Sequence, residues 1–233
     1  MGKPAIWVTG ASSGIGKSIA LKFIDSQKNV IVSSRNEKEL NNYLAKESDL
    51  IKVFPVDVTD AENVKSTFTN ISDEYDIDCL INNAGVTSFT PVENSTEEDL
   101  TKIINTNLSG AIRLIQQVLP GMIERKHGTI INILSVAADV VFKNSAIYSA
   151  SKAGLKAFAK VLREEVRKHN IRVINIYPGA TRTPIWPNNA LEEFGERMMS
   201  PDDIANLIYE LYQNNSTAIA EEIVLRPIQG DLK

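Results

Sequence analysis

The sequence predicts an α/β fold in which a doubly wound parallel sheet of about seven strands carries helices on both faces. Short runs of β-branched residues recur along the 233 residues, and polar segments with helical periodicity separate most of them. The runs are apolar almost throughout, as expected for strands that are buried on both faces. The alternation continues without a linker or an internal repeat, so we predict one domain spanning residues 1–233.

Seven segments carry the strand signal. In chain order they are AIWVTG (5–10), NVIVSS (29–34), LIKVFPVD (50–57), DCLINN (78–83), GTIINILS (128–135), IRVINIYP (171–178) and EEIVLRP (221–227). Because helical segments lie between them, right-handed crossovers should join parallel strands. Ligands bind at the carboxyl edge of such sheets, so that edge is the expected location of a site.

Helix starts are predicted where capping residues follow a strand. Thr59 with Glu62, and Ser95 with Glu98, have the spacing of a capping box. Ser200 is followed directly by proline, which is typical of a helix N-cap.

The longest predicted helix spans residues 149–168. Its apolar residues recur at intervals of three and four, which indicates a stripe facing the sheet: Leu155, Phe158, Leu162 and Val166. Residues 179–200 interrupt the regular pattern with prolines and asparagines, so we predict an irregular loop with short helical pieces.

The composition argues against several kinds of partner. A formal charge of -4 gives no general attraction to nucleic acid or to anionic lipid. No apolar stretch approaches the roughly 20 residues that span a bilayer, so no membrane association is expected. The first residues lack a basic leader and the lone Cys79 cannot form an internal disulfide, which predicts a reduced, cytoplasmic protein. His127, His169 and Cys79 are too dispersed to indicate a metal site.

The stretch Thr9–Ser18, TGASSGIGKS, fits two patterns. Its final GKS suits a relaxed phosphate loop, which would indicate nucleotide hydrolysis. Its TGxxxGxG spacing suits a strand that turns into a helix beneath a dinucleotide. Hydrolysis also requires an acid that holds Mg²⁺. Asp57 and Asp78 are weak candidates, since Asp78 precedes its strand instead of ending it.

The second half of the chain favours the dinucleotide interpretation. Tyr148 and Lys152 are four residues apart at the start of the long helix, so both side chains can point into one site. Ser135 ends a predicted strand, which delivers its hydroxyl to the carboxyl edge of the sheet. Each residue alone has an ordinary structural explanation, whereas their combination indicates chemistry.

The sequence resembles the short-chain dehydrogenase/reductase family, of the compact single-domain type. The matching motifs occur in the family's order and spacing across nearly the whole chain: TGASSGIG (9–16), NNAG (82–85), Asn107 within NTNLSG, Ser135, YSASK (148–152) and YPG (177–179). The resemblance implies a Rossmann-type fold and hydride transfer between a nicotinamide and a carbonyl or secondary alcohol. The phosphate-loop match is then a coincidence of Lys17 and Ser18.

The resemblance also implies a set of cofactor contacts. These are Gly10, Ser12, Ser13, Gly14, Ile15, Gly16, Ser34, Arg35, Asp57, Val58, Asn83, Ala84, Gly85, Tyr148, Lys152, Pro178, Gly179, Thr181 and Thr183. By analogy with the dinucleotide fingerprint, Gly10 permits the turn, Gly14 the approach of the pyrophosphate and Gly16 close packing of helix on strand. Asp57 could equally be an acid that leads into the Thr59 cap.

The implied catalytic residues are Asn107, Ser135, Tyr148 and Lys152. Tyr148 would act as general acid or base; as a base near neutrality it needs its pKa lowered by about 3 units from about 10. Lys152 and the charge of an oxidised nicotinamide are the expected source of that shift. Ser135 would hold the substrate oxygen, and Asn107 would organise a water and Lys152 into a proton relay.

The cofactor is predicted to be NADP(H) in preference to NAD(H). A site that prefers NAD places an acid at the end of the second strand, where this chain has Ser34 followed by Arg35. Arg35 would pair with the 2′-phosphate, and Ser33 or Ser34 would add hydroxyl donors. Ser13 stands where many NADP-preferring relatives have a basic residue, which departs from the pattern.

The predicted function is therefore an NADP(H)-dependent oxidoreductase, and the alternative is a catalytically silent sensor of NAD(P) with the same fold. The partner would be a small carbonyl or alcohol, with residues 179–200 forming a substrate loop. An apolar pocket is expected from Phe89, Val136, Val141, Ile185 and Trp186. The resemblance suggests a homodimer or homotetramer packed through helices near 97–125 and 149–168.

Overall fold

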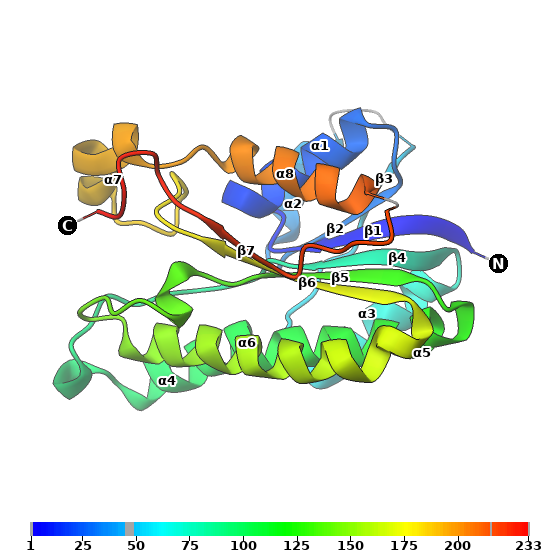
Figure 1. Cartoon of the computed structure of the whole chain (residues 1–233), viewed down its shortest axis with the longest axis horizontal. Coiled ribbons are helices and arrows are strands. Elements are labelled where there is room, and N and C mark those ends of the chain that lie inside the picture. The colour runs from blue at the N-terminus through cyan, green and yellow to red at the C-terminus, as the bar shows by residue number, and fades with distance from the viewer. Residues whose placement is uncertain (1, 45–48, 215, 233) are drawn as a thin grey trace.

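A computed structural model describes residues 2–44, 49–214 and 216–232 and shows one parallel sheet between two helical layers (Figure 1). The strand order is β3-β2-β1-β4-β5-β6-β7, and every pairing is parallel. The strands are β1 (Lys3–Thr9), β2 (Val30–Ser33), β3 (Ile51–Val53), β4 (Tyr75–Asn82), β5 (Gly128–Ile133), β6 (Ile171–Pro178) and β7 (Glu222–Leu225). The predicted doubly wound α/β fold is confirmed.

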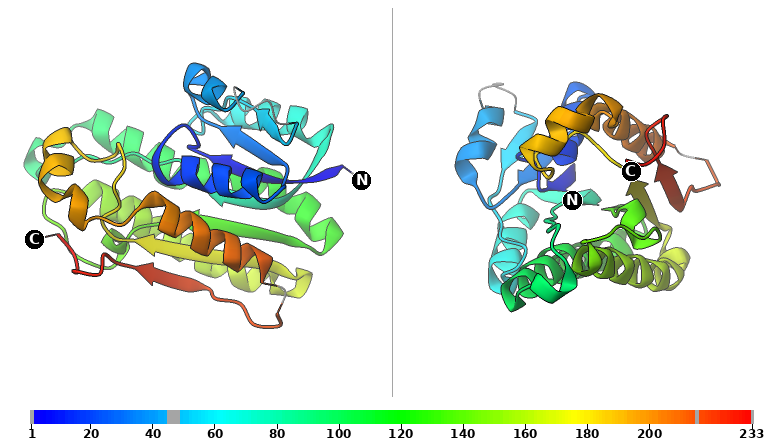
Figure 2. Two further views of the ribbon diagram at one scale, coloured as in Figure 1. Left: turned by 90° about the horizontal axis from the view of Figure 1, so that it is seen from above. Right: turned by 90° about the vertical axis from the view of Figure 1, so that its left-hand side faces the viewer.

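The helices divide between the two faces of the sheet. One layer contains α1 (Gly14–Asp25), α2 (Glu37–Leu44) and α8 (Pro201–Gln213). The other contains α3 (Ala61–Ser72), α5 (Ala111–Arg125) and α6 (Ala146–Val166), with α4 (Glu97–Ile104) leading into it. Figure 2 shows α1 and α8 side by side over the strands. No helix in the described part of the chain is long and apolar enough to cross a membrane.

Alternate residues of β1 belong to opposite cores. On β1, Ile6 and Val8 pack with α1 and α8, whereas Ala5 and Trp7 pack with the α3, α5 and α6 layer. All four side chains are buried. This explains why the strand segments are apolar almost throughout.

The direction of winding reverses between β3 and β4. The first three strands progress outward from β1, and the chain then returns to place β4 on the other side of β1. Loops that leave β1 and β4 therefore diverge at the carboxyl edge and open a crevice there. This crevice positions the site described below.

Two of the predicted helix starts are wrong by one residue. Asp60, not Thr59, caps α3, because the Thr59 hydroxyl donates to Asp57 at 2.7 Å. Thr96, not Ser95, caps α4, because the Ser95 hydroxyl donates to a carbonyl in the preceding turn at 3.1 Å. In both places a neighbouring interaction occupies the predicted cap and the next polar residue replaces it.

Other local predictions agree with the structure. Ser200 caps α8 in a capping box with Asp203. Helix α6 begins at Ala146, three residues earlier than predicted, and a short 3-10 turn follows Val166. The segment 179–200 is irregular, and it contains the short helix α7 (Asn188–Phe194). It lies at the end of the molecule where the strands have their carboxyl ends (Figure 1).

Candidate active site

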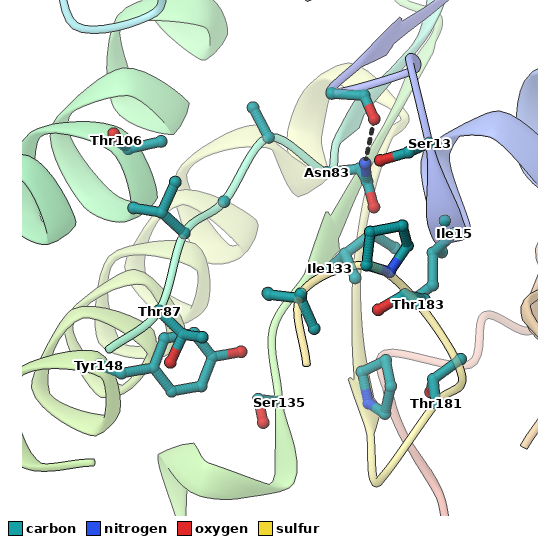
Figure 3. A pocket seen from close by; sticks show the side chains of 18 of the residues that line it. Ser13, Ile15, Asn83, Thr87, Thr106, Ile133, Ser135, Tyr148, Thr181 and Thr183 are labelled. Atoms are coloured by element: carbon teal, nitrogen blue, oxygen red, sulfur yellow. Dashed lines mark hydrogen bonds between the residues drawn. The ribbon is translucent and has the colours of Figure 1, made fainter. Parts of the chain in front are cut away.

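A cavity of about 1400 Å³ lies along the carboxyl edge of the sheet. Loops after β1, β2, β4, β5 and β6 form its walls, and Figure 3 shows part of the lining. Most of the predicted site residues line it, namely Gly10, Ser12, Ser13, Gly14, Ile15, Ser34, Arg35, Asp57, Val58, Asn83, Ala84, Gly85, Ser135, Tyr148, Lys152, Pro178, Gly179, Thr181 and Thr183. Gly16 and Asn107 lie behind this lining, and each supports it from there.

The glycine turn after β1 has the backbone that its sequence predicts. Gly10 has a φ of 62° and Gly14 a φ of 53°, a region that side chains disfavour. Helix α1 begins at Gly14, and its N-cap Ser13 makes no side-chain cap hydrogen bond. The first N–H groups of α1 and the positive end of its dipole therefore face the cavity, where an anion would be stabilised.

Gly16 is required by contact with the turn itself. A β-carbon at Gly16 would lie 2.4 Å from the Gly10 oxygen and 2.3 Å from Asn83 Nδ2. Asn83 Nδ2 donates to the carbonyl oxygens of Thr9 and Gly10, each at 3.0 Å, and Figure 3 marks a hydrogen bond of this amide. Gly16 therefore packs against the turn and Asn83, whereas the sequence predicted packing of the helix on the strand.

Ser135 and Tyr148 meet on one side of the cavity. Ser135 follows β5 and its hydroxyl oxygen accepts a hydrogen bond from the Ala137 N–H at 3.1 Å. Figure 3 shows the Tyr148 hydroxyl directed toward the strand end that carries Ser135. Burial raises the pKa of Tyr148, and a hydrogen bond with Ser135 partly opposes that rise. The protein alone thus keeps the phenol protonated, whereas work as a base requires a lower pKa.

Lys152 lies beneath the Tyr148 ring. Its side chain is buried, and Nζ lies 5.7 Å from the ring centroid. The ammonium donates to the carbonyl oxygen of Ile133 at 2.8 Å. Burial lowers the pKa of Lys152 to about 8, because the charged form is poorly solvated there.

Asn107 supports the wall of the cavity from behind. It lies in a π-helical turn, Asn105–Gly110, which links α4 to α5. Its amide accepts from the Val86 N–H at 2.8 Å and donates to the Val86 oxygen at 2.9 Å and to the Ser151 hydroxyl at 3.0 Å. The amide therefore holds the loop after β4 against α6. The predicted relay through water to Lys152 stays a prediction.

The end of the cavity nearest β2 contains the residues expected around the adenosine. Arg35 is exposed and lines the cavity. Asp57 also lines it, and one carboxylate oxygen accepts from the N–H and the hydroxyl of Thr59 at 2.9 and 2.7 Å. The Ser33 hydroxyl donates to the Phe54 oxygen at 2.6 Å and accepts from Trp7 Nε1. The Ser33 hydroxyl is thus already hydrogen-bonded within the core. Of the two predicted hydroxyl donors, Ser34 is therefore the better placed to contact a cofactor.

An aromatic pair lies at the other end. The rings of Phe89 and Trp186 stack with centroids 5.3 Å apart, and Trp186 Nε1 donates to the Thr181 oxygen at 3.1 Å. The pair connects the loop after β4 with the loop after β6. Val136 and Ile185 line the cavity as predicted. Val141 is 93% exposed and does not line it, so that prediction was wrong.

Sequence reasoning missed several residues that line the cavity. Thr87 and Thr106 flank the loop that Asn107 supports, and Asp231 and Leu232 come from the last residues described. Asp231 forms an ion pair with Arg226. Thr106 lies within NTNLSG and Thr87 follows NNAG by two residues, so these motifs were signals for the first two. No local pattern marks Asp231 or Leu232, because only the folded backbone brings them to the cavity.

The phosphate-loop interpretation finds little support in the arrangement, because only Asp57 of Lys17, Asp57 and Asp78 lines the cavity. Lys17 is exposed on α1 and does not line the cavity. Asp78 lies toward the opposite edge of the sheet, where it contacts His127 at 2.8 Å and the hydroxyl of Tyr212 at 2.5 Å. Neither residue is placed to hold a nucleotide with Mg²⁺ in the cavity.

Comparison with known proteins settles the family. The family model for short chain dehydrogenases matches residues 4–193. The chain belongs to the short-chain dehydrogenase family. A sepiapterin reductase of Chlorobaculum tepidum is 37% identical over 243 residues, which cover 99% of this chain and 99% of that relative. As a short-chain dehydrogenase, the protein is an oxidoreductase that acts on the CH–OH group of donors with NAD(P) as acceptor.

Solved structures of other short-chain dehydrogenases share the fold. A serine dehydrogenase complexed with NADP⁺ superposes with a TM-score of 0.92 at 26% identity, over 98% of this chain and 96% of that one. A 4-hydroxyisoleucine dehydrogenase complexed with NADH and succinate gives a TM-score of 0.86 at 29% identity, over 95% and 97%. Relatives of this short-chain dehydrogenase thus bind either nicotinamide dinucleotide.

Proposed function

We propose that this protein is an NADP(H)-dependent oxidoreductase that interconverts a carbonyl and a secondary alcohol, with Tyr148 as general acid or base. The observation that carries the proposal is the convergence of Ser135, Tyr148 and Lys152 on a cavity that begins at the glycine turn. Hydride transfer to a carbonyl carbon requires a proton for the oxygen, and a phenol held at that position provides one.

The residues present fit a nicotinamide dinucleotide. The uncapped N-terminus of α1 suits the anionic pyrophosphate, and the positive φ at Gly10 and Gly14 favours glycine, which presents no side chain there. The cavity exceeds the roughly 300–1,000 Å³ usual for one small ligand, which leaves room for a substrate beside the cofactor. When bound, the cofactor supplies or accepts the hydride.

Side chains of the protein then donate and accept the proton. In the reducing direction, protonated Tyr148 donates its proton to the carbonyl oxygen while the Ser135 hydroxyl holds that oxygen. The tyrosinate that forms is stabilised by the Lys152 ammonium, which lies 5.7 Å from the ring centroid. Because the pKa of Tyr148 is raised, its phenol is protonated at neutral pH and can act as the acid. Oxidation runs the same steps in reverse and needs the added positive charge of the oxidised nicotinamide.

Preference for NADP(H) is supported by the charges near β2. Arg35 lines the cavity just beyond the strand end, where a guanidinium suits a 2′-phosphate. Ser33 and Ser34 occupy the strand end where an NAD-preferring site has an acid. The Ser34 hydroxyl is bonded within its own turn, to the Asn36 oxygen at 3.2 Å, so it can reorient toward a phosphate.

The substrate end supports a carbonyl attached to an apolar or flat group. Phe89 and Trp186 present stacked rings, and Val136 and Ile185 extend the apolar surface. The likeness to a sepiapterin reductase places sepiapterin on the panel to be tested, with serine oxidation and simple ketones beside it.

The test is NADPH oxidation against this panel by purified enzyme, with Tyr148→Phe as the critical variant. We expect at least one carbonyl to be reduced, and Tyr148→Phe to lower kcat by about 100-fold or more while NADPH still binds. Tyr209→Phe is the matched control and should leave kcat unchanged, because Tyr209 on α8 does not line the cavity and its hydroxyl accepts a hydrogen bond from Gln213. A fully active Tyr148→Phe enzyme would remove Tyr148 from the mechanism, and NADPH binding without any turnover would favour the sensor.

A homodimer or homotetramer also belongs to the proposal. Val161 on α6 and Val224 on β7 are 60% and 57% exposed, which suits burial against a second copy. Sedimentation velocity of the purified protein tests this, and a monomer at micromolar concentration would contradict it.

A further inference from the structure

Four polar side chains form a ladder across half of the sheet. Asn82, Asn132, Asn175 and Glu222 are register partners on β4, β5, β6 and β7. Each asparagine Nδ2 donates to the side-chain oxygen of the next strand, at 3.0, 3.0 and 3.2 Å. We call this row the amide ladder. The three asparagines are buried, and only the Glu222 end of the ladder reaches solvent.

The outer end of the amide ladder is anchored to α6. Glu222 accepts a hydrogen bond from Arg163 Nη2 at 2.6 Å and another from the Tyr177 hydroxyl. Arg163 is 5% exposed, and its Nε donates to the Val173 oxygen at 3.0 Å. The ladder therefore ends in an ion pair with the helix that also carries Tyr148 and Lys152.

The ladder distinguishes one strand register from others. Strands β5 and β6 both contain an INI triplet, so a slip by two residues would leave apolar side chains facing the same layer. Such a slip would separate the buried amides and leave donors and acceptors unpaired, which is costly. Apolar contacts alone do not select the register that the amides select.

The register determines which residues leave the sheet at the cavity. Three residues beyond Asn82 comes Gly85, and three beyond Asn132 comes Ser135; the same offset from Asn175 reaches Pro178. All three of these later residues line the cavity. Lys152 bonds to the strand between Asn132 and Ser135, at the Ile133 oxygen.

We propose that Asn132 and Asn175, with Glu222 as their anchor, are positioning residues of the active site. The amide ladder keeps the carboxyl ends of β4, β5 and β6 in register, and this register aligns Ser135 with Lys152. None of the ladder residues lines the cavity, so they act through the residues that do. This inference rests on the proposed function for its kinetic consequence.

The ladder should affect turnover more than cofactor binding. The pyrophosphate site lies on β1 and α1, which contribute no residue to the ladder. Misalignment of the β5 and β6 ends disturbs the reacting groups and leaves the glycine turn in place. A split between kcat and the NADPH dissociation constant is therefore the signature of positioning.

The decisive comparison is between one substitution and three. Asn132→Leu leaves Asn82 Nδ2 without its acceptor and Asn175 Oδ1 without its donor. We therefore expect a lower Tm and a kcat reduced about tenfold, with NADPH affinity within about twofold. The triple variant Asn82→Leu, Asn132→Leu, Asn175→Leu removes all unpaired amides, so Tm should recover while kcat stays low. Asn29→Ala, which removes one surface hydrogen bond to the Pro4 oxygen, is the matched control and should match wild type.

A wild-type kcat in the triple variant would overturn the proposal, because the ladder would then serve stability alone. If Asn132→Leu does not fold, Glu222→Ala replaces it, because this substitution at the half-exposed sheet edge removes the anchor of the ladder. An unchanged kcat in Glu222→Ala would also overturn the proposal. Hydrogen–deuterium exchange gives a readout that needs no substrate. We expect faster exchange at 134–136 and 177–179 in the ladder variants; if the wild type reduced no carbonyl, unchanged exchange at these segments would still refute the ladder's role.

Discussion

The Lys152 ammonium donates a hydrogen bond to the carbonyl oxygen of Ile133 at 2.8 Å. Ile133 is the last residue of β5, and Ser135 follows two residues later. The helix residue proposed to stabilise the tyrosinate is therefore attached to the strand that carries the hydroxyl proposed to bind substrate. This buried hydrogen bond therefore links the position of Lys152 to the position of Ser135.

The pKa of Lys152 predicts the pH dependence of carbonyl reduction. Burial lowers this pKa from its ordinary value to about 8, so the side chain is charged below about pH 8 and neutral above it. A neutral Lys152 cannot stabilise the tyrosinate, so kcat for reduction should fall as the pH rises through that value. The measurement is kcat against pH from 6 to 10 in a constant-ionic-strength buffer.

Removal of the ammonium should abolish this dependence. We expect Lys152→Met to lower kcat by about 100-fold and to flatten the alkaline limb. Lys156→Met, one turn later on α6 and paired with Asp139, is the control and should retain the wild-type profile. An alkaline limb that persists in Lys152→Met would assign the titration to another group.

Charge reversal at Arg35 should change the choice of cofactor. Arg35→Asp removes the guanidinium and adds an anion beside the 2′-phosphate, so the KM for NADPH should rise by about 10–100-fold. The KM for NADH should fall or stay constant, because NADH has no 2′-phosphate. Lys168→Asp, which changes the charge equally in the 3-10 turn that follows α6, controls for net charge. Unchanged selectivity in steady-state kinetics would defeat the assignment.

A methyl group at Gly16 should destabilise the protein. It would meet the Gly10 oxygen at 2.4 Å, and backbone there cannot move without disturbing the turn. We expect Gly16→Ala to cost about 1–3 kcal/mol of unfolding free energy and to weaken NADPH binding. Gly121→Ala is the matched control, since its methyl would meet only the flexible end of Arg125 and alanine favours a helix. Urea denaturation that ranks the two variants equally would contradict this.

Loss of the aromatic pair should affect substrate affinity alone. Trp186→Ala removes a ring that stacks on Phe89, so we expect the KM for an aromatic or apolar carbonyl to rise by about 2–10-fold. The affinity for NADPH should not change, and Trp186→Phe should restore most of the substrate affinity. If KM is unaltered in Trp186→Ala, then the pair packs the loop and does not contact substrate.

Local sequence patterns predicted much of the site because its residues follow strands directly. Ser135 is two residues past β5, and the glycine turn immediately follows β1, so strand assignment alone brings them to one edge. Tyr148 and Lys152 share a helical face through their spacing. The errors at Thr59 and Ser95 arose where a short-range side-chain interaction competes with capping, which spacing does not reveal.

The electrostatics of the site were less predictable. In the protein alone, burial raises the pKa of Tyr148. The lowered phenol pKa expected from Lys152 together with an oxidised nicotinamide stays a prediction. Burial depends on everything packed around the ring and has no signature in a motif. Sequence reasoning left open whether Ser33 or Ser34 would add a hydroxyl donor, and the structure shows the Ser33 hydroxyl bonded to Phe54 and Trp7.

The sequence by itself determined the parallel α/β architecture, the glycine turn and the residues proposed for proton transfer, because each depends on periodicity or on a spacing of a few residues. Only the tertiary structure decided which side chains reach the cavity from distant segments, which hydroxyls are already committed to hydrogen bonds, and how the amide ladder levels the strand ends. These depend on burial and on strand register, which arise when residues far apart in the chain pack together.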